Sequence, residues 1–175
     1  GDANFSAKLP FTYPKFINSL ATYDYKPCEQ MGTMEGEYNY DAVMDIQWPF
    51  GHGLSYTQFE YGKVTLDSKE MTQDGKIVLT VPVTNVGKRE GAEIVQLYIC
   101  DKKSSLSRPE KELKGFCKVK LAAGETKTVS FTIDKSSLSF FDDKQHKWVA
   151  EPGKFEAVIA ASAEDIKSKT VFELK

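Results

Sequence analysis

The sequence has little of what metal centres, membrane spans and nucleic-acid surfaces require. It contains two histidines and three cysteines, and no cysteine lies in a CxxC pair, so we expect no zinc site. The 23 Lys plus Arg against 25 Asp plus Glu give a formal net charge of −2, which offers no basic field to nucleic acid or to an anionic membrane. Apolar runs are far shorter than the roughly 18 residues of a transmembrane helix, and no signal-peptide pattern opens the chain. We therefore predict no metal, no cofactor, no nucleic acid and no membrane partner.

Common catalytic motifs are absent as well. The sequence holds no GxSxG, HExxH, P-loop or GxGxxG motif, which disfavours nucleotide binding and serine or zinc hydrolysis. His52 lies between two glycines, and His146 lies in a polar turn. Structural roles are favoured for both, although one histidine beside one reactive group could still be catalytic.

Paired carboxylates are candidates for hydrolytic chemistry, because glycoside hydrolysis requires two, about 5 Å or roughly 6.5–9.5 Å apart. Three pairs are close in sequence: Glu35 with Glu37, Asp41 with Asp45, and Asp142 with Asp143. The first lies in an acidic and aromatic stretch, and rings stack on sugar faces while carboxylates accept hydrogen bonds from hydroxyls. Glu35, Glu37, Tyr38 and Tyr40 are thus candidate substrate-binding residues, and a solvated or domain-facing loop is the alternative.

The chain divides near residue 57 into two parts of different character. Residues 1–57 hold about half of the aromatic residues, but these follow neither the helical nor the strand period. Proline and glycine interrupt every candidate helix or strand there. Long stretches without regular structure are usually functional or packed on something else. We predict that residues 1–57 are an irregular docking and linker segment that lies on a surface outside the chain.

From about Phe59 onward the hydrophobic pattern has a period of two, which is typical of strands with one face on a core. Turn signals such as Asp74-Gly75 and Pro152-Gly153 separate the strands. Seven or eight short strands without a helix predict an all-β domain over residues 58–175, an immunoglobulin-like or fibronectin III-like sandwich. An up-and-down barrel is the alternative. The expected strands are 59–67, 77–84, 95–100, 113–121, 127–134, Trp148 with its neighbours, 155–161 and 170–174.

A series of short motifs in fixed order is the most specific feature of the sequence. It begins with residues 49–57 and Phe59-Glu60-Tyr61, continues with residues 91–98 and Arg108-Pro109, and ends with residues 111–116, 123–126, Trp148 and 151–153. The series resembles the C-terminal fibronectin III-like domain of family 3 glycoside hydrolases. Residues 1–14 resemble the segment that closes the preceding α/β domain of these enzymes, although Asn4-Phe5-Ser6-Ala7 departs from the usual Asn-Pro-Ser-Gly and Trp48 replaces the usual Tyr.

The resemblance implies a retaining β-glycosidase, usually a β-glucosidase or β-xylosidase, with an Asp nucleophile on a barrel and an acid/base residue generally from the α/β domain. This sequence has no Ser-Asp-Trp nucleophile motif, so no catalytic residue can be assigned and the chain alone is expected to be inactive on glycosides. The same resemblance implies that the barrel and α/β domains are the partners of this chain. It also favours a periplasmic or secreted enzyme.

Two functions follow as hypotheses. The first is a non-catalytic accessory domain that braces the catalytic domains, with Trp48, Phe50, His52 and Tyr56 as domain-docking residues. The alternative is a carbohydrate-binding or adhesion module that holds an oligosaccharide on an exposed row of aromatic residues. Its candidates are Tyr98, Phe140, Phe141 and Trp148, which we expect in the core or at an interface instead. A structural cell-surface sandwich unrelated to sugars would leave the motif series unexplained.

Overall fold

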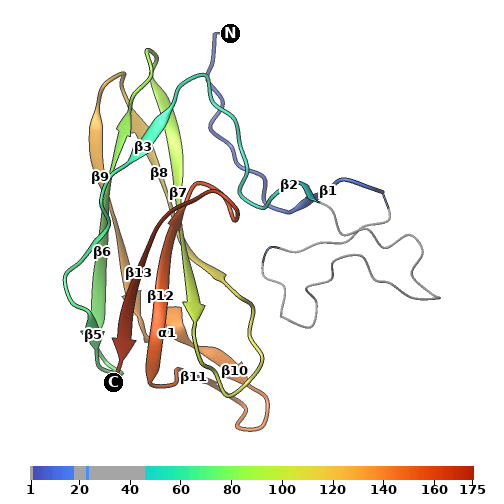
Figure 1. Ribbon diagram of the computed structural model, residues 1–175, viewed down its shortest axis with the longest axis vertical. Helices are drawn as coiled ribbons and strands as arrows, with labels where there is room; N and C mark the ends of the chain where they lie inside the picture. Colours follow the sequence, from blue (N-terminus) through green and yellow to red (C-terminus); the bar gives the residue numbers. More distant parts are fainter. Residues whose placement is uncertain (1, 18–22, 24–45) are drawn as a thin grey trace.

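Two β-sheets packed face to face form the body of the protein in the computed structural model, which describes residues 2–17, 23 and 46–175 (Figure 1). The larger sheet has five strands in the order β5-β13-β12-β7-β8. It is antiparallel except that β5 runs parallel to β13. These strands are β5 (Glu70–Met71), β7 (Gly91–Asp101), β8 (Glu112–Leu121), β12 (Gly153–Ala160) and β13 (Ile166–Leu174).

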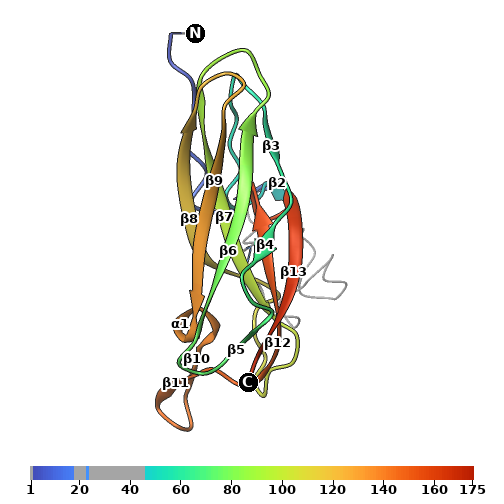
Figure 2. The same ribbon diagram turned by 90° about the vertical axis from the view of Figure 1, so that its left-hand side faces the viewer.

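β6 (Lys76–Asn85) is the centre of the second sheet. β9 (Thr126–Asp134) pairs with one edge of β6, and β3 (Phe59–Tyr61) and β4 (Thr65–Leu66) lie one after the other along its other edge. Figure 2 views the molecule from the side of this sheet, with β9 and β6 in front. Two separate sheets confirm the predicted sandwich and contradict the up-and-down barrel. Among the described residues they hold nine strands rather than seven or eight.

The strand expected from Phe59 to Asp67 is interrupted at residues 62–64, and Pro82 on β6 explains the break. The backbone of Pro82 faces this edge of the sheet, because its carbonyl accepts a hydrogen bond from the N–H of Gly62 at 2.8 Å. A proline has no N–H to donate in return, so the ladder cannot continue past it. A Cβ at Gly62 would also stand only 2.5 Å from the proline ring, which leaves room for glycine alone.

The hydrophobic core fills the space between the two sheets. The residues of β6 that the alternation places inward are completely buried, namely Ile77, Leu79, Val81 and Val83. They belong to one cluster with side chains from all the long strands, including Leu97, Leu121, Phe131, Phe155, Ile159 and Phe172. A fully buried side chain of this kind contributes roughly 1.5–3 kcal/mol relative to an exposed one. The predicted core of the sandwich is therefore confirmed.

A single helical turn follows β9, although the sequence predicts no helix. α1 (Lys135–Leu138) begins at Asp134, whose carboxylate accepts a hydrogen bond from the Ser137 N–H at 3.1 Å, while the Ser137 hydroxyl accepts one from the Asp134 N–H at 3.4 Å. This capping box satisfies two of the free N–H groups at the start of the turn. A helix of four residues is too short to show a helical period in the sequence.

A hairpin of β10 (Phe140–Asp142) and β11 (Lys147–Val149) closes the same end of the sandwich (Figure 1). Asp142 holds its turn, because its carboxylate accepts hydrogen bonds from the N–H groups of Lys144 and Gln145 at 2.9 and 3.1 Å. These hydrogen bonds lower the pKa of the Asp142 carboxyl. Of the candidate carboxylate pair Asp142 and Asp143, the first thus has a local structural role.

The described parts of residues 1–57 lie beside the five-stranded sheet, where β1 (Tyr13–Pro14) pairs with β2 (Ile46–Trp48). These parts of the N-terminal segment change the burial of β7. The alternation of apolar residues in its sequence predicts that only one of its faces is buried. Gln96, Tyr98 and Cys100 on its outer face are buried as well as Val95, Leu97 and Ile99 on its inner face. The expectation of one-sided burial is therefore wrong for this strand.

Candidate functional site

Gln96 connects the N-terminal segment to the sandwich from the outer face of β7. Its side-chain nitrogen donates to the carbonyl oxygens of Gly51 and Ala161 at 3.2 and 2.9 Å, and its oxygen accepts from the Tyr98 hydroxyl at 2.6 Å. A buried amide without these partners would cost about 1–3 kcal/mol per group. Gly51 has a φ of 77°, and a Cβ there would meet the Gln96 oxygen at 2.3 Å. Only glycine fits this close approach.

Phe50 covers a second apolar cluster on the same outer face. The cluster contains Tyr98, Cys100, Val158, Ala160 and Ala163, against which Tyr23, Phe50 and Leu113 pack. The Phe50 ring stacks on the Tyr23 ring with centroids 4.2 Å apart, and the Phe50 carbonyl accepts from the Ala163 N–H at 2.8 Å. Burial raises the pKa of the Tyr98 hydroxyl above its ordinary value and so keeps the hydrogen bond to Gln96 in place. Phe50 therefore docks on this chain's own sheet.

Asn4 fixes the two halves of the segment to each other and to the loop between β6 and β7. Its side-chain oxygen accepts from the Tyr56 N–H at 2.8 Å and from the Ser55 hydroxyl at 3.2 Å. Its side-chain nitrogen donates to the Glu90 carbonyl at 3.1 Å. Leu9 adds a backbone pairing, because its carbonyl accepts from the Gly51 N–H at 2.8 Å. The segment is thus held by directed hydrogen bonds at both ends.

An ion pair with little exposure lies beneath this segment. The Lys8 ammonium lies 2.9 Å from the Glu93 carboxylate on β7, and the two side chains are 14% and 8% exposed. The Tyr61 hydroxyl on β3 donates to the same carboxylate oxygen at 3.2 Å. Burial first, and the negative charge of Glu93 second, raise the pKa of Tyr61 well above its ordinary value. The Tyr61 hydroxyl therefore remains a donor to Glu93 in the physiological range.

The segment carries exposed aromatic rings, most of which contact one another in two groups, one around Trp48 and Tyr13 and one of Phe5 with Tyr56. Trp48 meets Tyr13 edge to face at 5.1 Å and lies nearly parallel to His52 at 6.4 Å. Tyr13 contacts Phe11 at 6.0 Å. Exposed apolar groups of this extent mark interaction surfaces. We call these exposed rings, together with the exposed Leu54 side chain, the aromatic surface: Phe5, Phe11, Tyr13, Phe16, Trp48, Leu54 and Tyr56.

The structure thus separates the four residues predicted to dock. Trp48 and Tyr56 are 42% and 49% exposed and belong to the aromatic surface, where Tyr56 contacts Phe5 at 5.0 Å. His52 lies nearly parallel to the Trp48 ring, with an interplanar angle of 16°. Phe50 points the other way, onto the sandwich. Sequence alone distinguishes none of these roles, because all four residues lie within the short stretch 48–56, which follows neither the helical nor the strand period.

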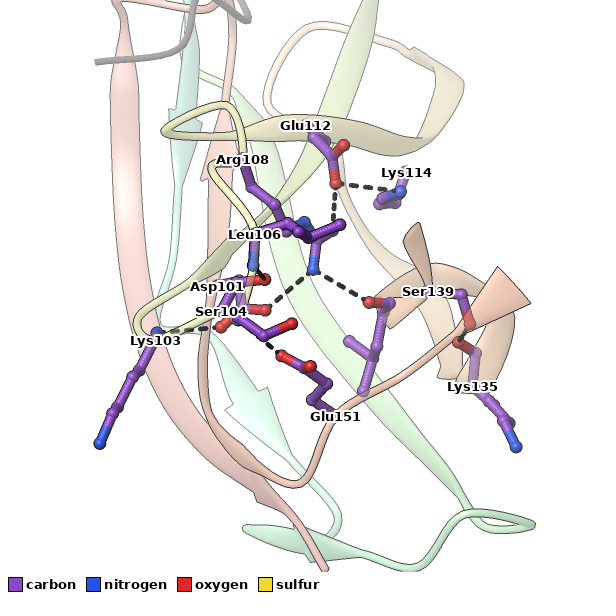
Figure 3. A network of polar contacts seen from close by, with 12 residues as sticks. Asp101, Lys103, Ser104, Leu106, Arg108, Glu112, Lys114, Lys135, Ser139 and Glu151 are labelled. Atoms are coloured by element: carbon purple, nitrogen blue, oxygen red, sulfur yellow. Dashed lines mark hydrogen bonds and ion pairs between the residues drawn. The ribbon is translucent and has the colours of Figure 1, made fainter. Parts of the chain in front are cut away.

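A buried network of charges organises the opposite end of the sandwich (Figure 3). The Arg108 guanidinium donates to Asp101 at 2.9 Å, to Glu112 at 2.5 Å and to the Leu138 carbonyl at 3.2 Å. It also lies over the Phe140 ring, 5.2 Å from the centroid. The side chains of Arg108 and Asp101 are only 7% and 4% exposed. Arg108 therefore ties the β7–β8 loop, α1 and the hairpin to the sheet, and it presents no reactive group to solvent.

The remaining candidate residues have the following places. Glu35, Glu37, Tyr38, Tyr40 and the pair Asp41 with Asp45 lie outside the described residues. His146 occupies the hairpin turn with a φ of 51°. No group of His, Cys, Asp and Glu within residues 2–17, 23 and 46–175 is arranged to hold a metal ion. No helix in the described part of the chain is long and apolar enough to cross a membrane.

Four polar residues that matter here escape the sequence analysis as individual sites: Lys8, Glu93, Gln96 and Arg108. Glu93 and Gln96 stand out only as polar residues within the apolar run of β7, which is a usable signal for a strand covered on both faces. Arg108 is part of a recognised motif, but its partners come from three separate parts of the chain. Lys8 carries no signal, because nothing in its neighbourhood in sequence points to Glu93.

Comparison with known proteins agrees with this architecture. Residues 93–163 match the family described as the fibronectin type III-like domain. The chain is 45% identical to beta-glucosidase BoGH3A of Bacteroides ovatus over 99% of its own length and 25% of that protein. It is 43% identical to the periplasmic beta-glucosidase of Salmonella typhimurium over 99% of the chain and 23% of that protein.

A solved structure of a β-glucosidase from Erythrobacter marinus superposes with a TM-score of 0.89 at 32% identity, over 99% of this chain and 22% of that one. The chain therefore spans about a quarter of the length of the curated relatives it matches. It belongs to the part of the family 3 β-glucosidases that carries their fibronectin type III-like domain.

Proposed function

We propose that the chain is a non-catalytic accessory region of a retaining β-glycosidase acting on β-glucosides or β-xylosides. Residues 58–175 form the folding unit, and residues 1–57 connect it to the catalytic domains and brace them. The observation that carries this proposal is the aromatic surface, which is exposed outward while its backbone is fixed to the sandwich by Asn4, Gln96 and the Lys8–Glu93 ion pair.

The physical basis of the bracing role is a segment that is held rigidly on the sandwich and has an exposed apolar side. Interfaces between domains of one chain bury about 600–1,500 Å², and a set of partly exposed rings of this size can supply one side of such an interface. The anchoring contacts matter because a mobile segment would lose conformational entropy on docking. Relatives are named β-glucosidases and are about four times as long, so they have the residues to supply the other side.

The test compares one substitution in two settings. Trp48→Ala in the isolated chain should change the free energy of unfolding little, because the side chain is 42% exposed there. The same change in the full-length glycosidase should lower the melting temperature and accelerate loss of activity on an aryl β-glucoside on warming. Phe116→Ala on β8 is the control, since this ring is 70% exposed and lies outside the aromatic surface. Equal effects of Trp48→Ala in both settings would contradict the bracing role.

The acidic and aromatic stretch Glu35, Glu37, Tyr38 and Tyr40 is proposed to reach the rim of the catalytic cleft in the full-length enzyme. The double change Glu35→Gln with Glu37→Gln should then raise KM for an oligosaccharide and leave the melting temperature unchanged. The chain alone should hydrolyse neither aryl β-glucosides nor aryl β-xylosides. Hydrolysis by the purified chain would overturn its non-catalytic assignment.

A further inference from the structure

The hairpin of β10 and β11 presents two large aromatic rings to solvent. Phe141 and Trp148 are direct partners across the two strands, so their side chains lie on the same face. The rings meet edge to face with centroids 5.8 Å apart, and they are 51% and 68% exposed. Of the two expected places, in the core or at an interface, this position excludes the core for both rings. Exposing such rings sacrifices the burial energy that aromatic residues usually supply.

The opposite face of the hairpin is firmly attached to the sandwich. Phe140 is 8% exposed and lies under the Arg108 guanidinium, and Asp142 is 9% exposed and holds the turn. Arg108 in turn is fixed by two carboxylates and by the Leu138 carbonyl of α1 (Figure 3). The two outward rings therefore stand on a support that is already in place before any ligand arrives.

A shallow hollow next to Trp148 supplies polar groups. It has a volume of about 600 Å³ and is lined by Trp148, Lys135, Ser136 and Ser139, which is within the range of roughly 300–1,000 Å³ for small-molecule sites. The Ser136 hydroxyl donates to the Asp134 carboxylate at 2.6 Å, and the Ser139 hydroxyl donates to the Lys135 carbonyl at 2.7 Å. Both hydroxyl oxygens keep lone pairs as acceptors, and the Lys135 ammonium is a donor.

We propose that this end of the sandwich is a binding site for a neutral glycan chain. The apolar face of a pyranose ring stacks on Trp148, beside Phe141, and its hydroxyl rim exchanges hydrogen bonds with Ser136, Ser139 and Lys135. A sugar ring is the ligand that combines one apolar C–H face with a rim of uncharged donors and acceptors. Aromatic side chains with one apolar face and polar neighbours provide the matching surface.

The surrounding charges favour a neutral ligand over an anion. The tip of the hairpin carries Asp142 and Asp143 against Lys144 and Lys147, and the start of α1 carries Asp134 against Lys135. Positive and negative groups are therefore matched, so no net field attracts phosphate or carboxylate.

The size of the patch argues against a protein partner. A stable protein interface buries about 800 Å² on each side, whereas two rings of about 150–250 Å² each, both already partly covered, fall well short of that area. The hairpin also lies at the opposite end of the sandwich from β3, away from β1 and β2 of the aromatic surface (Figure 1). Docking through that surface would leave the hairpin accessible.

The experiment uses the 175-residue chain in affinity electrophoresis through gels that contain soluble mixed-linkage β-glucan, xylan or dextran. The choice of β-glucan as the first probe rests on the proposed function. The structural evidence for the site does not depend on that function. We expect retardation by at least one glycan, with Trp148→Ala weakening the affinity at least tenfold and Phe141→Ala weakening it less. Phe116→Ala, an equally exposed ring on β8, should bind like the unchanged chain.

A fluorescence titration provides the independent readout. The chain has two tryptophans, so Trp48→Phe leaves Trp148 as the only one, and its emission should shift on titration with cellohexaose or with the glycan that retards the chain.

Ser136→Ala keeps both rings and should weaken binding severalfold even if Trp148→Ala fails to fold. Absence of retardation by all three glycans, or unchanged binding by Trp148→Ala and Ser136→Ala, would overturn the site. A concentration-dependent dimer that Trp148→Ala abolishes would overturn it in favour of a second copy of the chain. Neither result would affect the bracing test, which depends on Trp48.

Discussion

Arg108 is the residue on which most of one end of the molecule depends. Arg108→Ala would leave the Asp101 carboxylate, with a 4% exposed side chain, buried without its cation. Removing one partner of a buried pair costs about 3–5 kcal/mol, so we expect a loss of that size in urea unfolding. The control is Lys120→Ala, because the Lys120–Glu90 pair is 70% and 59% exposed and should contribute less than about 1 kcal/mol. Similar losses in the two variants would show that burial does not decide the contribution here.

Tyr61 should make the protein sensitive to alkali. Burial and the neighbouring Glu93 charge raise the pKa of Tyr61 above its ordinary value of 10.0, so the folded chain keeps a proton that the unfolded chain loses. Its stabilising effect is therefore fully present below pH 10 and is lost as the pH rises further, by up to about 1.4 kcal/mol per pH unit. Urea midpoints measured between pH 8 and pH 11 should fall more steeply for the unchanged chain than for Tyr61→Phe. Parallel curves would refute the raised pKa of Tyr61 in the folded chain.

Among the elements, α1 depends on a single cap. Asp134→Ala removes the carboxylate that accepts from Ser137, and loss of an N-cap costs about 0.5–2 kcal/mol. Hydrogen bonds, the one from the Ser136 hydroxyl foremost, lower the pKa of Asp134, so its contribution is present above the ordinary value of 3.8 and is lost as the pH falls below it. The difference in melting temperature between the variant and the unchanged chain should therefore be larger at pH 7 than at pH 3. Asp143→Ala, an exposed carboxylate in the adjacent hairpin, should show no such difference.

The strands could be predicted from sequence where burial follows a simple alternation. In β6 the buried residues Ile77, Leu79, Val81 and Val83 alternate with partly exposed residues, so the pattern correctly predicts which face of the strand is buried. The alternation misleads at β7, because Gln96 and Tyr98 on its outer face are covered by a segment about 45 residues earlier in the chain. The break between β3 and β4 also depends on Pro82, a residue of the neighbouring strand. Local patterns carry no information about contacts of this kind.

At the scale of the whole molecule, the sandwich and its family could be recognised from the order of the motifs, whereas the site contacts could not. Trp48 and Phe50 are two residues apart in the same motif, yet one faces outward and the other packs on the sheet. The sequence predicts Trp148 and Phe141 in the core or at an interface, and only the hairpin register places both rings on one face, where they are exposed. Tertiary contacts set the direction of a side chain in an irregular segment, and the hydrophobic period does not predict such contacts.

The proposed boundary at residue 57 leads to a prediction about the whole chain. The main core lies entirely within residues 58–175, so this part should fold alone. Its outer face would nevertheless lose Phe50, Tyr23 and the Gly51 carbonyl that accepts from Gln96, which exposes the second cluster around Tyr98 and Cys100. We therefore expect residues 58–175 to unfold cooperatively but with a stability reduced by several kcal/mol, on the order of 25 cal/mol for each Å² of apolar surface uncovered.

Cys100 reports directly on that exposure. It is 9% exposed in the full chain, and burial raises the pKa of its thiol, so a thiol reagent should label it slowly. In a Cys28→Ser, Cys117→Ser background Cys100 is the only cysteine, and its labelling should accelerate at least tenfold when residues 1–57 are removed. Gln96→Leu in the full chain should give an intermediate rate, because it releases Gly51 while leaving Phe50 in place. If the truncated and full chains were labelled at the same rate, the N-terminal segment would not be what protects Cys100, and the segment would be held to the sandwich by its polar contacts alone.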